Sequence, residues 1–337
     1  MGKADVVMAE ARGFMKSRVI LTAAELGFFT SLDEKPCGAE ELASEKGIDA
    51  RAATRVLDCL ITFGLLEKQN GTYKPTESGA FYSARHPETV LPMIMHMNRL
   101  WNTWSGLTEV VKTGGLSVEK PGIHMDEESW KSFIGAMHVA GRQLAQIIAG
   151  DYDTGRFNRL LDIGGASGTY SIAFLRRNPA MTAVIFDLEN VIPMAAERIA
   201  EEGMENRIDL VAGDFYRDEF PGGCDLALLS AIIHQNSPDK NVDLYTKIYN
   251  ALEPGGAIVI RDYVMDESRT EPPAGALFAI NMLVNTQRGD TYTFREIESG
   301  LQQAGFKDVK PVRYCEGMDC LVEGRKPSTP VPNQVEK

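Results

Sequence analysis

Apolar side chains recur every three or four residues over the first part of the chain, which is the spacing of helices with one buried face. This spacing predicts helices within residues 8–29, 37–47 and 49–66. The dipeptide Asn70-Gly71 follows, and it favours a tight turn between two antiparallel strands. Two short helices, a longer helix and a hairpin predict a winged helix-turn-helix.

The pattern remains helical over residues 90–150 and then changes. From residue 158 onward, short apolar runs alternate with helical segments, which is typical of strands in a doubly wound, mostly parallel sheet. Near the end, two further runs flank a turn at Glu316-Gly317 and predict an antiparallel C-terminal hairpin. The fold class is therefore α/β and Rossmann-like, preceded by a mainly helical winged-helix domain. The predicted parallel strands are 159–164, 183–188, 208–214, 224–230 and 257–263.

Composition excludes several classes of protein. The 337 residues are 44% hydrophobic and 24% charged, without an apolar run of the roughly 18 residues that would span a bilayer. A net charge of −12 opposes binding to a nucleic-acid backbone. The five cysteines are scattered and form no CxxC pair, so neither a disulfide framework nor a metal site is expected. The N-terminus lacks the pattern of a signal peptide, and we expect a cytoplasmic protein without membrane or nucleic-acid partners.

A glycine-rich loop carries the first sign of chemistry. Asp162, Gly164, Gly165 and Gly168 lie where a predicted strand ends and a helix begins. Glycines there allow a tight turn and the close approach of a ligand to backbone amides. The loop alone does not distinguish a dinucleotide from S-adenosylmethionine, and a plain strand-to-helix turn is the simpler alternative.

Asp187, followed by Leu188, ends the second strand, where a carboxylate accepts hydrogen bonds from the ribose hydroxyls of either ligand. Two other features favour S-adenosylmethionine. The loop reads G-G-x-x-G, not the G-x-G-x-x-G of dinucleotide sites. The third strand ends in a triplet that offers a carboxylate for an adenine amino group and an aromatic face for its ring. That triplet is Gly213, Asp214 and Phe215.

His234 is the candidate catalytic residue. It follows the fourth strand, and ligands of open α/β sheets bind at the carboxyl ends of the strands. Methyl transfer to a hydroxyl requires loss of the hydroxyl proton, and histidine titrates in the useful range. The alternative is a histidine that merely caps the helix after it.

These segments resemble the class I small-molecule O-methyltransferases, which include hydroxyindole, hydroxyneurosporene and caffeate-type enzymes. The resemblance covers residues 10 to 325 and implies S-adenosylmethionine as cofactor, a winged-helix dimerisation region that forms a homodimer, and a substrate pocket between the domains. The matching segments are LLDIGGASG, FDLENV, GDF, LLSAIIHQNS, LEPGGAIVIRD and AINMLVNT.

The resemblance also assigns residues and shows three departures. Asp262 falls where the family carries an acidic partner for the histidine, with a solvated strand end as the alternative. The family commonly reads His-Asp-Trp, whereas here Gln235 and Asn236 follow His234. Ser230, expected at the cofactor, replaces a basic residue, and Thr291 replaces a second acidic partner.

The expected domains are 1–110 for winged-helix dimerisation, 111–157 as a helical linker lining the pocket, 158–325 for S-adenosylmethionine binding and methyl transfer, and 326–337 as a disordered tail. Phe133 and Met137 match a family segment near the reacting methyl group, and Met282 is another candidate wall of the pocket, although each fits an ordinary core position as well. Many Met and Trp side chains and few charges favour an aromatic or polycyclic substrate.

Two other functions stay open. The departures around His234 favour a cofactor-binding relative with altered chemistry, such as C-methylation or hydroxylation of a natural product. The winged helix also allows a transcription regulator. Residues 51–79 carry nearly as many acidic as basic side chains, which is a poor balance for a protein that must contact many phosphates.

Overall fold

The computed structural model describes residues 2–115 and 127–328. His124 and most of the predicted tail lie outside this range. The chain forms two compact units, one made of residues 1–102 and 131–139 and the other of 103–130 and 140–337. No helix in the described ranges is both long and apolar enough to cross a membrane.

The first unit contains the predicted winged helix-turn-helix. Asp49 caps the longer helix by accepting a hydrogen bond from the Ala52 amide, and Asn70 and Gly71 turn the hairpin with φ of 50° and 81°. Its elements are α1 (Lys3–Glu25), α2 (Phe28–Glu34), α3 (Ala39–Lys46), α4 (Ala50–Thr62), β1 (Leu66–Gln69), β2 (Thr72–Pro75), α5 (Glu77–Ala80) and most of α6 (Leu91–Ser105).

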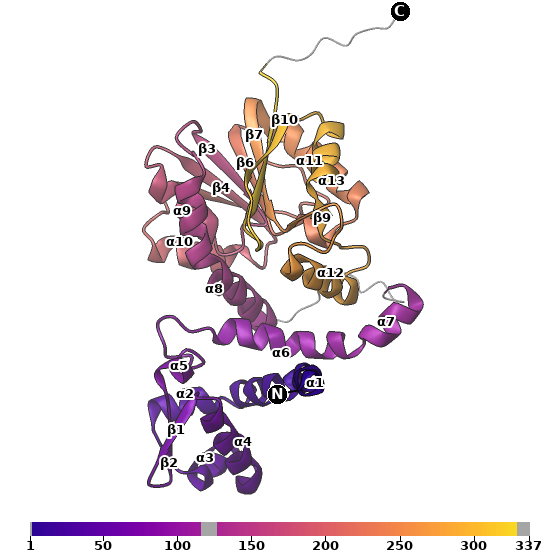
Figure 1. Cartoon of the computed structure of the whole chain (residues 1–337). Helices are drawn as coiled ribbons and strands as arrows, with labels where there is room; N and C mark the ends of the chain where they lie inside the picture. Colours follow the sequence, from indigo (N-terminus) through magenta and orange to yellow (C-terminus); the bar gives the residue numbers. More distant parts are fainter. Residues whose placement is uncertain (1, 116–126, 329–337) are drawn as a thin grey trace, which may run out of the picture. The chain divides into compact units, whose positions relative to one another are not determined.

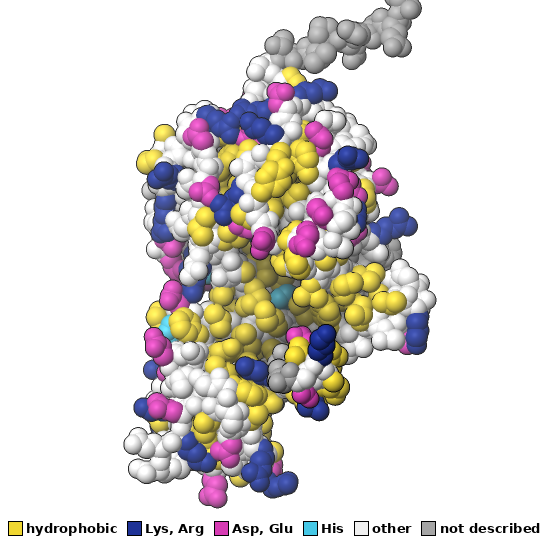
Figure 2. All heavy atoms as spheres, viewed as in Figure 1, with side chains coloured by type: hydrophobic (Ala, Val, Ile, Leu, Met, Phe, Trp, Pro, Cys, Tyr) yellow, Lys and Arg dark blue, Asp and Glu magenta, His cyan; other side chains and the backbone are white. Residues whose placement is uncertain are grey.

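The winged helix has its own core, in which Phe28, Leu32, Leu42, Leu57 and Tyr73 are almost completely buried. The helices and the hairpin are the indigo part of Figure 1. Lys, Arg, Asp and Glu side chains are mixed over the surface of this unit in Figure 2. In contrast to the buried core, α1 exposes a set of large apolar side chains. These are Val6, Val7, Met8, Phe14 and Met15.

The second unit is the α/β domain (Figure 1). Its helices are α7 (Leu107–Thr113), the later part of α8 (Glu127–Asp151), α9 (Thr169–Arg177), α10 (Ile192–Glu201), the 3-10 turn η1 (Ile233–Gln235), α11 (Pro238–Ala251), α12 (Pro273–Asn285) and α13 (Phe294–Gln303). Its strands are β3 (Arg159–Ile163), β4 (Thr182–Asp187), β5 (Ile208–Ala212), β6 (Cys224–Ser230), β7 (Leu252–Asp262), β8 (Val264–Met265), β9 (Tyr292–Thr293), β10 (Lys307–Arg313) and β11 (Cys320–Arg325).

Seven strands form one sheet in the order β10-β11-β7-β6-β3-β4-β5. The five from β7 to β5 are parallel, and β11 pairs antiparallel with both β7 and β10. The predicted fold class, a mostly parallel doubly wound sheet with an antiparallel C-terminal hairpin, is confirmed. β8 and β9 form a separate parallel pair.

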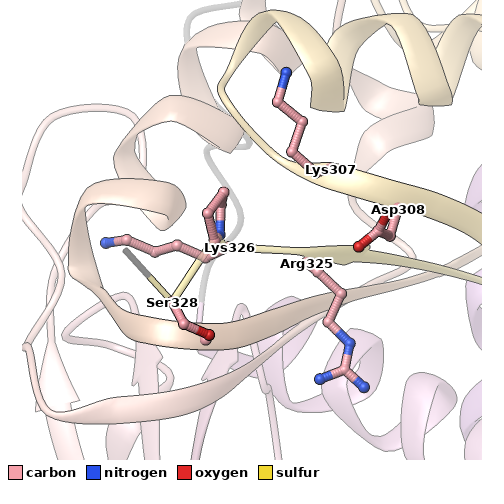
Figure 3. A pocket seen from close by; sticks show the side chains of 7 residues that line it. Lys307, Asp308, Arg325, Lys326 and Ser328 are labelled. Carbon is pink, nitrogen blue, oxygen red and sulfur yellow. The ribbon is translucent and has the colours of Figure 1, made fainter. Parts of the chain in front are cut away.

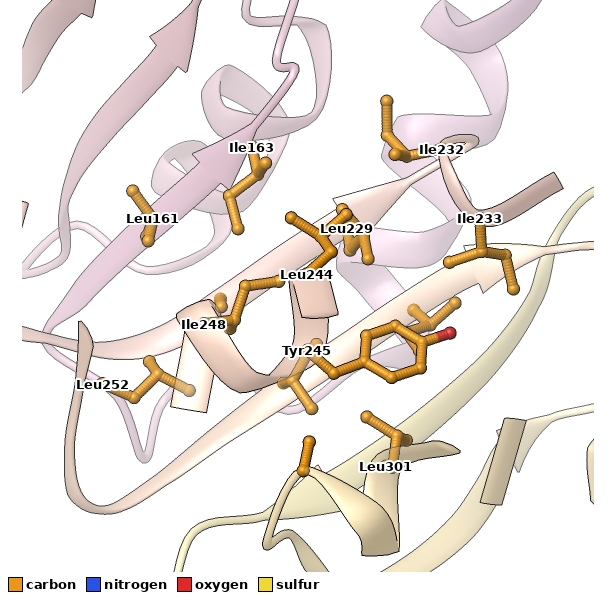
Figure 4. Close-up of a cluster of buried hydrophobic side chains, with 14 of the residues drawn as sticks. Leu161, Ile163, Leu229, Ile232, Ile233, Leu244, Tyr245, Ile248, Leu252 and Leu301 are labelled. Atoms are coloured by element: carbon orange, nitrogen blue, oxygen red, sulfur yellow. The ribbon is translucent and has the colours of Figure 1, made fainter. Parts of the chain in front are cut away.

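The sheet is buried on both faces because its strands alternate two sets of apolar side chains. Leu161, Leu229 and Ile260 point to the face covered by α11 and α13, where Leu244 and Leu301 meet them (Figure 4). The residues that alternate with these along each strand point to the opposite face of the sheet, where α8, α9 and α10 cover them. Burial of each large side chain stabilises the fold by about 1.5–3 kcal/mol.

Register brings the strand ends to one edge. Ile163 of β3 pairs with Leu229 of β6, and Ser230 pairs with Arg261 of β7. The last residues of these strands therefore lie side by side, directly before the loops that carry the predicted chemistry.

Substitution of Leu229 tests how far the sheet core supports this edge. Leu229 is fully buried, so Leu229→Ala is expected to lower the free energy of unfolding by about 2–5 kcal/mol in urea denaturation. Leu277→Ala is the control, because Leu277 is 61% exposed on α12 and its loss is expected to change stability by less than about 0.5 kcal/mol. Equal effects of the two substitutions would contradict the described packing.

Candidate functional site

His234 and Asp262 form a hydrogen-bonded pair at the carboxyl edge of the sheet. The Nδ1 atom of His234 lies 3.0 and 2.8 Å from the two carboxylate oxygens of Asp262. The side chains are 12% and 1% exposed. With Nδ1 donating to the carboxylate, Nε2 is left as a proton acceptor. The arrangement is that of a general base oriented by an acid.

The turn that carries His234 is held from several sides. The His234 carbonyl accepts a hydrogen bond from the Asp290 amide at 2.9 Å, and the Ile233 carbonyl accepts one from Asn241 at 3.0 Å. The Tyr292 hydroxyl donates to the Asn236 carbonyl. A Cβ on Gly289 would come within 2.5 Å of the His234 carbonyl oxygen, so the loop after α12 packs tightly on this turn.

Asn236, one of the departures from the family pattern, is a buried part of this frame. It is 1% exposed, its amide donates to Asn241 at 2.9 Å, and its side-chain oxygen accepts from Tyr216. Thr291 is also buried and provides no carboxylate. Among the described residues, Asp262 is the acid that bonds His234.

The glycine loop connects β3 to α9 as expected. Gly164 and Gly168 have φ of 65° and 74°, which side chains rarely adopt. A larger residue cannot replace Gly165 without a steric clash, because a Cβ there would lie 2.8 Å from the Asp162 carboxylate carbon. The Asp162 carboxylate is buried and accepts from Ser171 at 2.6 Å. Burial is the main cause that raises the pKa of Asp162 to about 6.

Asp187 fastens this loop to the end of β4. Its carboxylate accepts from the Ala166 amide at 2.8 Å and the Leu188 amide at 2.7 Å. Burial raises the pKa of Asp187, and these two amides oppose the rise. A carboxylate has about four acceptor positions, so two remain for ligand hydroxyls.

The third strand end lies beside the same loop. The Gly213 amide donates to the Asp187 carbonyl, and the ring of Phe215 lies 3.6 Å from the position of a Cβ on Gly164. Asp214 is more exposed, and its carboxylate accepts from the Tyr216 amide. The structure therefore brings the predicted loop and strand-end residues together.

Three residues at this edge were not predicted. Arg261 donates from Nε to Ser230 at 2.7 Å, and its guanidinium lies 4.8 Å from the ring of Tyr170. Phe278 of α12 meets His234 edge to face at 4.8 Å between ring centroids. Arg261 could have been noticed as a charge inside an apolar strand, but no local signal marks Tyr170 or Phe278.

The predicted substrate residues belong to different elements. Met282 is 6% exposed on α12, one helical turn after Phe278 and therefore on the same face of that helix. Phe133 and Met137 lie on α8 in the first unit, where Phe133 contacts the His96 ring at 5.5 Å. The role of Phe133 and Met137 in substrate binding stays a prediction.

A different hollow lies at the opposite edge of the sheet (Figure 3). It is lined by Lys307, Arg325, Lys326 and Ser328 among others, near the start of β7. Lys326 is fixed there by bonds to the Tyr249 and Leu252 carbonyls. This hollow contains none of the predicted site residues.

The residues present fit S-adenosylmethionine. The two acceptor positions left on Asp187 match the hydroxyls of a ribose, and Phe215 offers a flat face beside the glycine loop. No group of three or more potential metal ligands occurs within the described ranges.

Comparison with known proteins identifies the family. Residues 111–307 match the model of an O-methyltransferase domain, and residues 8–85 match that of the O-methyltransferase dimerisation domain. These matches do not favour the alternatives of altered chemistry or a transcription regulator.

Individual relatives agree with the family models. The chain is 32% identical to a 3-hydroxy-5-methyl-1-naphthoate 3-O-methyltransferase of Streptomyces sahachiroi, over 94% of this chain and 93% of that protein. It is 30% identical to the tetracenomycin polyketide synthesis 8-O-methyl transferase TcmO of Streptomyces glaucescens, over 97% of each. The crystal structure of human N-acetylserotonin methyltransferase in complex with SAM matches with a TM-score of 0.85 at 25% identity, over 97% of this chain and 99% of that one. The chain therefore belongs to the O-methyltransferase family and is an S-adenosylmethionine-dependent O-methyltransferase.

Proposed function

We propose that this enzyme methylates a hydroxyl group on an aromatic or polycyclic small molecule, with His234 as general base. The observation that carries the proposal is the His234–Asp262 pair at the edge of the sheet, beside the glycine loop and Phe278. When bound, S-adenosylmethionine supplies a methyl group on a positively charged sulfur.

His234 performs the proton transfer in this proposal. Its Nε2 atom accepts the proton of the acceptor hydroxyl, which makes the oxygen a stronger nucleophile. The imidazole then becomes positively charged, and the buried Asp262 carboxylate stabilises that charge through Nδ1. The bonds that hold the turn keep Nε2 in one position and lower the cost of orienting it.

The cofactor residues act at the neighbouring strand ends. Asp187 would accept the ribose hydroxyls of the cofactor, with Leu188 beside it. Phe215 would offer its ring, and Asp214 a carboxylate, to the adenine. The glycines at 164, 165 and 168 would allow close approach along the loop, while Asp162, Gly213 and Ser230 would line the remaining surface.

The substrate class is supported by two lines of argument. One relative from Streptomyces is named for a naphthoate, and the other for tetracenomycin polyketide synthesis. In this chain, Phe278 presents its ring to His234, and Met282 follows on the same helix face. A flat aromatic acceptor gains from such contacts more than a sugar would. Phe133 and Met137 belong to the other unit, and their contact with the substrate remains a prediction from the family resemblance.

A homodimer is the second part of the proposal. Residues 8–85 match a dimerisation domain. In addition, α1 exposes five large apolar side chains to water, and such a patch is typical of a protein interface. Two of them, Val7 and Phe14, are 66% and 55% exposed. Burial against a second copy removes this surface from water.

The catalytic role is tested with His234→Ala. In a methyl-transfer assay over a panel of phenols and naphthols, kcat is expected to fall about 10²- to 10⁴-fold, because the substitution removes Nε2 as the proton acceptor. Affinity for S-adenosylhomocysteine, measured by calorimetry, is expected to stay within about threefold of wild type. Asp262→Asn is expected to lower kcat as well, whereas His86→Ala, in the connection between α5 and α6, is the control that is expected to leave kcat unchanged. Turnover of the His234 variant within a few-fold of wild type would exclude the general base.

The cofactor assignment is tested by the melting temperature. S-adenosylhomocysteine at saturating concentration is expected to raise the Tm of the wild-type protein by several degrees, since binding to the folded state stabilises it. Asp187→Ala is expected to abolish the shift by removing the ribose contact. Asp243→Ala, an exposed change on α11, is expected to keep it. A full shift in the Asp187 variant would refute its role.

The dimer is tested by light scattering after gel filtration. The wild-type protein is expected at twice the chain mass, and Val7→Glu combined with Phe14→Glu at the mass of one chain, because the charges cannot be buried against a partner. Val111→Glu is the control, since Val111 is 64% exposed on α7, outside the matched dimerisation domain. A monomeric wild-type protein would overturn the proposal.

A further inference from the structure

Arg261 places a buried positive charge at the edge of the sheet. Asp162, Leu228 and Val259 are in register across β3, β6 and β7. Ser230 and Arg261 follow two residues later on β6 and β7. The side chain of Arg261 therefore points to the same face of the sheet as that of Asp162. The residue is 7% exposed. An arginine so deeply buried at a strand end needs partners for its charge.

The described residues satisfy Arg261 only in part. Nε donates to the Ser230 hydroxyl at 2.7 Å, and Nη1 donates to the Met318 carbonyl at 2.6 Å. A guanidinium has five N–H donors, so these two neutral acceptors leave donors over. Among the side chains that the structure describes, no carboxylate lies within 4.0 Å of it, and Asp319 is paired with Arg313 at 3.0 Å.

Tyr170 adds a second donor that has no partner. Its ring lies 4.8 Å from the Arg261 guanidinium carbon, and its hydroxyl oxygen is buried without a hydrogen-bond partner among the described residues. Burial raises the pKa of Tyr170, so the hydroxyl keeps its proton at neutral pH. A cation and a buried O–H donor side by side require an acceptor, and an anion satisfies both.

Asp162 supplies the opposite charge on the same face. The charge of Arg261 acts to lower the pKa of Asp162, against the rise that burial causes, and the charge of Asp162 acts to raise the pKa of Tyr170. The edge therefore offers an anion next to a cation. This is the complement of a zwitterion, whose ammonium group is attracted to Asp162 and whose carboxylate is attracted to Arg261 and Tyr170.

We propose that Arg261 and Tyr170 bind the α-carboxylate of the amino-acid tail of the cofactor, while Asp162 binds its α-ammonium group. The inference rests on the proposed placement of the nucleoside at Asp187, because the tail then extends along the glycine loop. The guanidinium reaches the end of β6 from the neighbouring strand β7 and bonds the Ser230 hydroxyl there.

The experiment compares two ligands that differ in the carboxylate. S-adenosylmethionine and its decarboxylated form are titrated by calorimetry into the full-length protein without acceptor. The wild-type protein is expected to bind S-adenosylmethionine about 10- to 100-fold more tightly, as a charge-assisted contact predicts. Arg261→Met is expected to abolish this preference, Arg261→Lys to retain part of it, and Tyr170→Phe to reduce it about threefold to tenfold.

Two further variants separate the possible explanations. Asp162→Asn is expected to weaken both ligands equally relative to 5′-methylthioadenosine, which lacks the tail, because it acts on the ammonium group. Arg207→Met is the matched structural control, since Arg207 bonds the Leu175, Asn178 and Met181 carbonyls at the opposite edge of the sheet. It is expected to leave the preference between ligands unchanged.

The outcomes distinguish this inference from the proposed function. If Arg261→Met leaves the wild-type preference unchanged, the carboxylate site is refuted while the nucleoside site stands. If this variant does not fold, Arg261→Lys and Tyr170→Phe take its place in the comparison. Equal binding of both ligands by the wild-type protein has the same meaning. If 5′-methylthioadenosine binds the wild type and Asp187→Ala equally well, the placement of the nucleoside itself fails.

Discussion

A common register across β3, β6 and β7 is the constraint on which the rest of the site depends. It aligns the ends of three strands at one edge and fixes the face to which each last side chain points. Alternation along β7 then directs two consecutive charged residues to opposite sides. Asp262 meets His234, and Arg261 meets Ser230 on the face of Asp162. A slip of one residue would exchange these two side chains and place a cation beside His234.

This geometry places charge where the fold would otherwise be apolar, and it costs stability. Asp162 is fully buried with a pKa raised to about 6, and Arg261 is buried without a carboxylate partner in the described chain. Buried groups with strongly perturbed pKa values cluster at functional sites. The two large apolar clusters on either side of the sheet offset this cost and hold the strand ends in register. Stability and function are thus divided between the middle of the sheet and its carboxyl edge.

Most of the fold could be predicted from the sequence because its signals are local. Short apolar runs that alternate with helical segments indicated the five parallel strands, and Asn70-Gly71 indicated the hairpin that the structure contains. The glycine loop and Asp187 could be predicted for the same reason, since a strand-to-helix turn and the end of a strand are both marked by the local sequence. The pairing of His234 with Asp262, whose Nδ1 and carboxylate are in direct contact, was inferred from a resemblance and not from local pattern.

The residues that were missed depend on contacts between distant parts of the chain. Phe278 reaches His234 from α12, and Tyr170 reaches Arg261 from α9, and neither pairing leaves a mark in either segment alone. Phe14 shows a second limit of prediction from sequence, which concerns the surface that covers an apolar side chain. Its helical spacing with other apolar residues fits a buried face, yet it is 55% exposed in the single chain. Periodicity identifies which face of a helix is apolar but not which surface covers it.

The departure from the His-Asp-Trp pattern has a different meaning once the contacts are known. Asn236 does not weaken the histidine pair, because its side chain is bonded to Tyr216 and Asn241 and its carbonyl to Tyr292. It joins three elements to the turn that carries His234. The departure therefore alters how the turn is supported, while the contact of His234 with Asp262 remains. At Ser230 a neighbouring strand also changes what the position means, because the guanidinium of Arg261 on β7 bonds the Ser230 hydroxyl and brings a positive charge to the end of β6. A motif compared position by position therefore misses groups that reach the site from neighbouring segments.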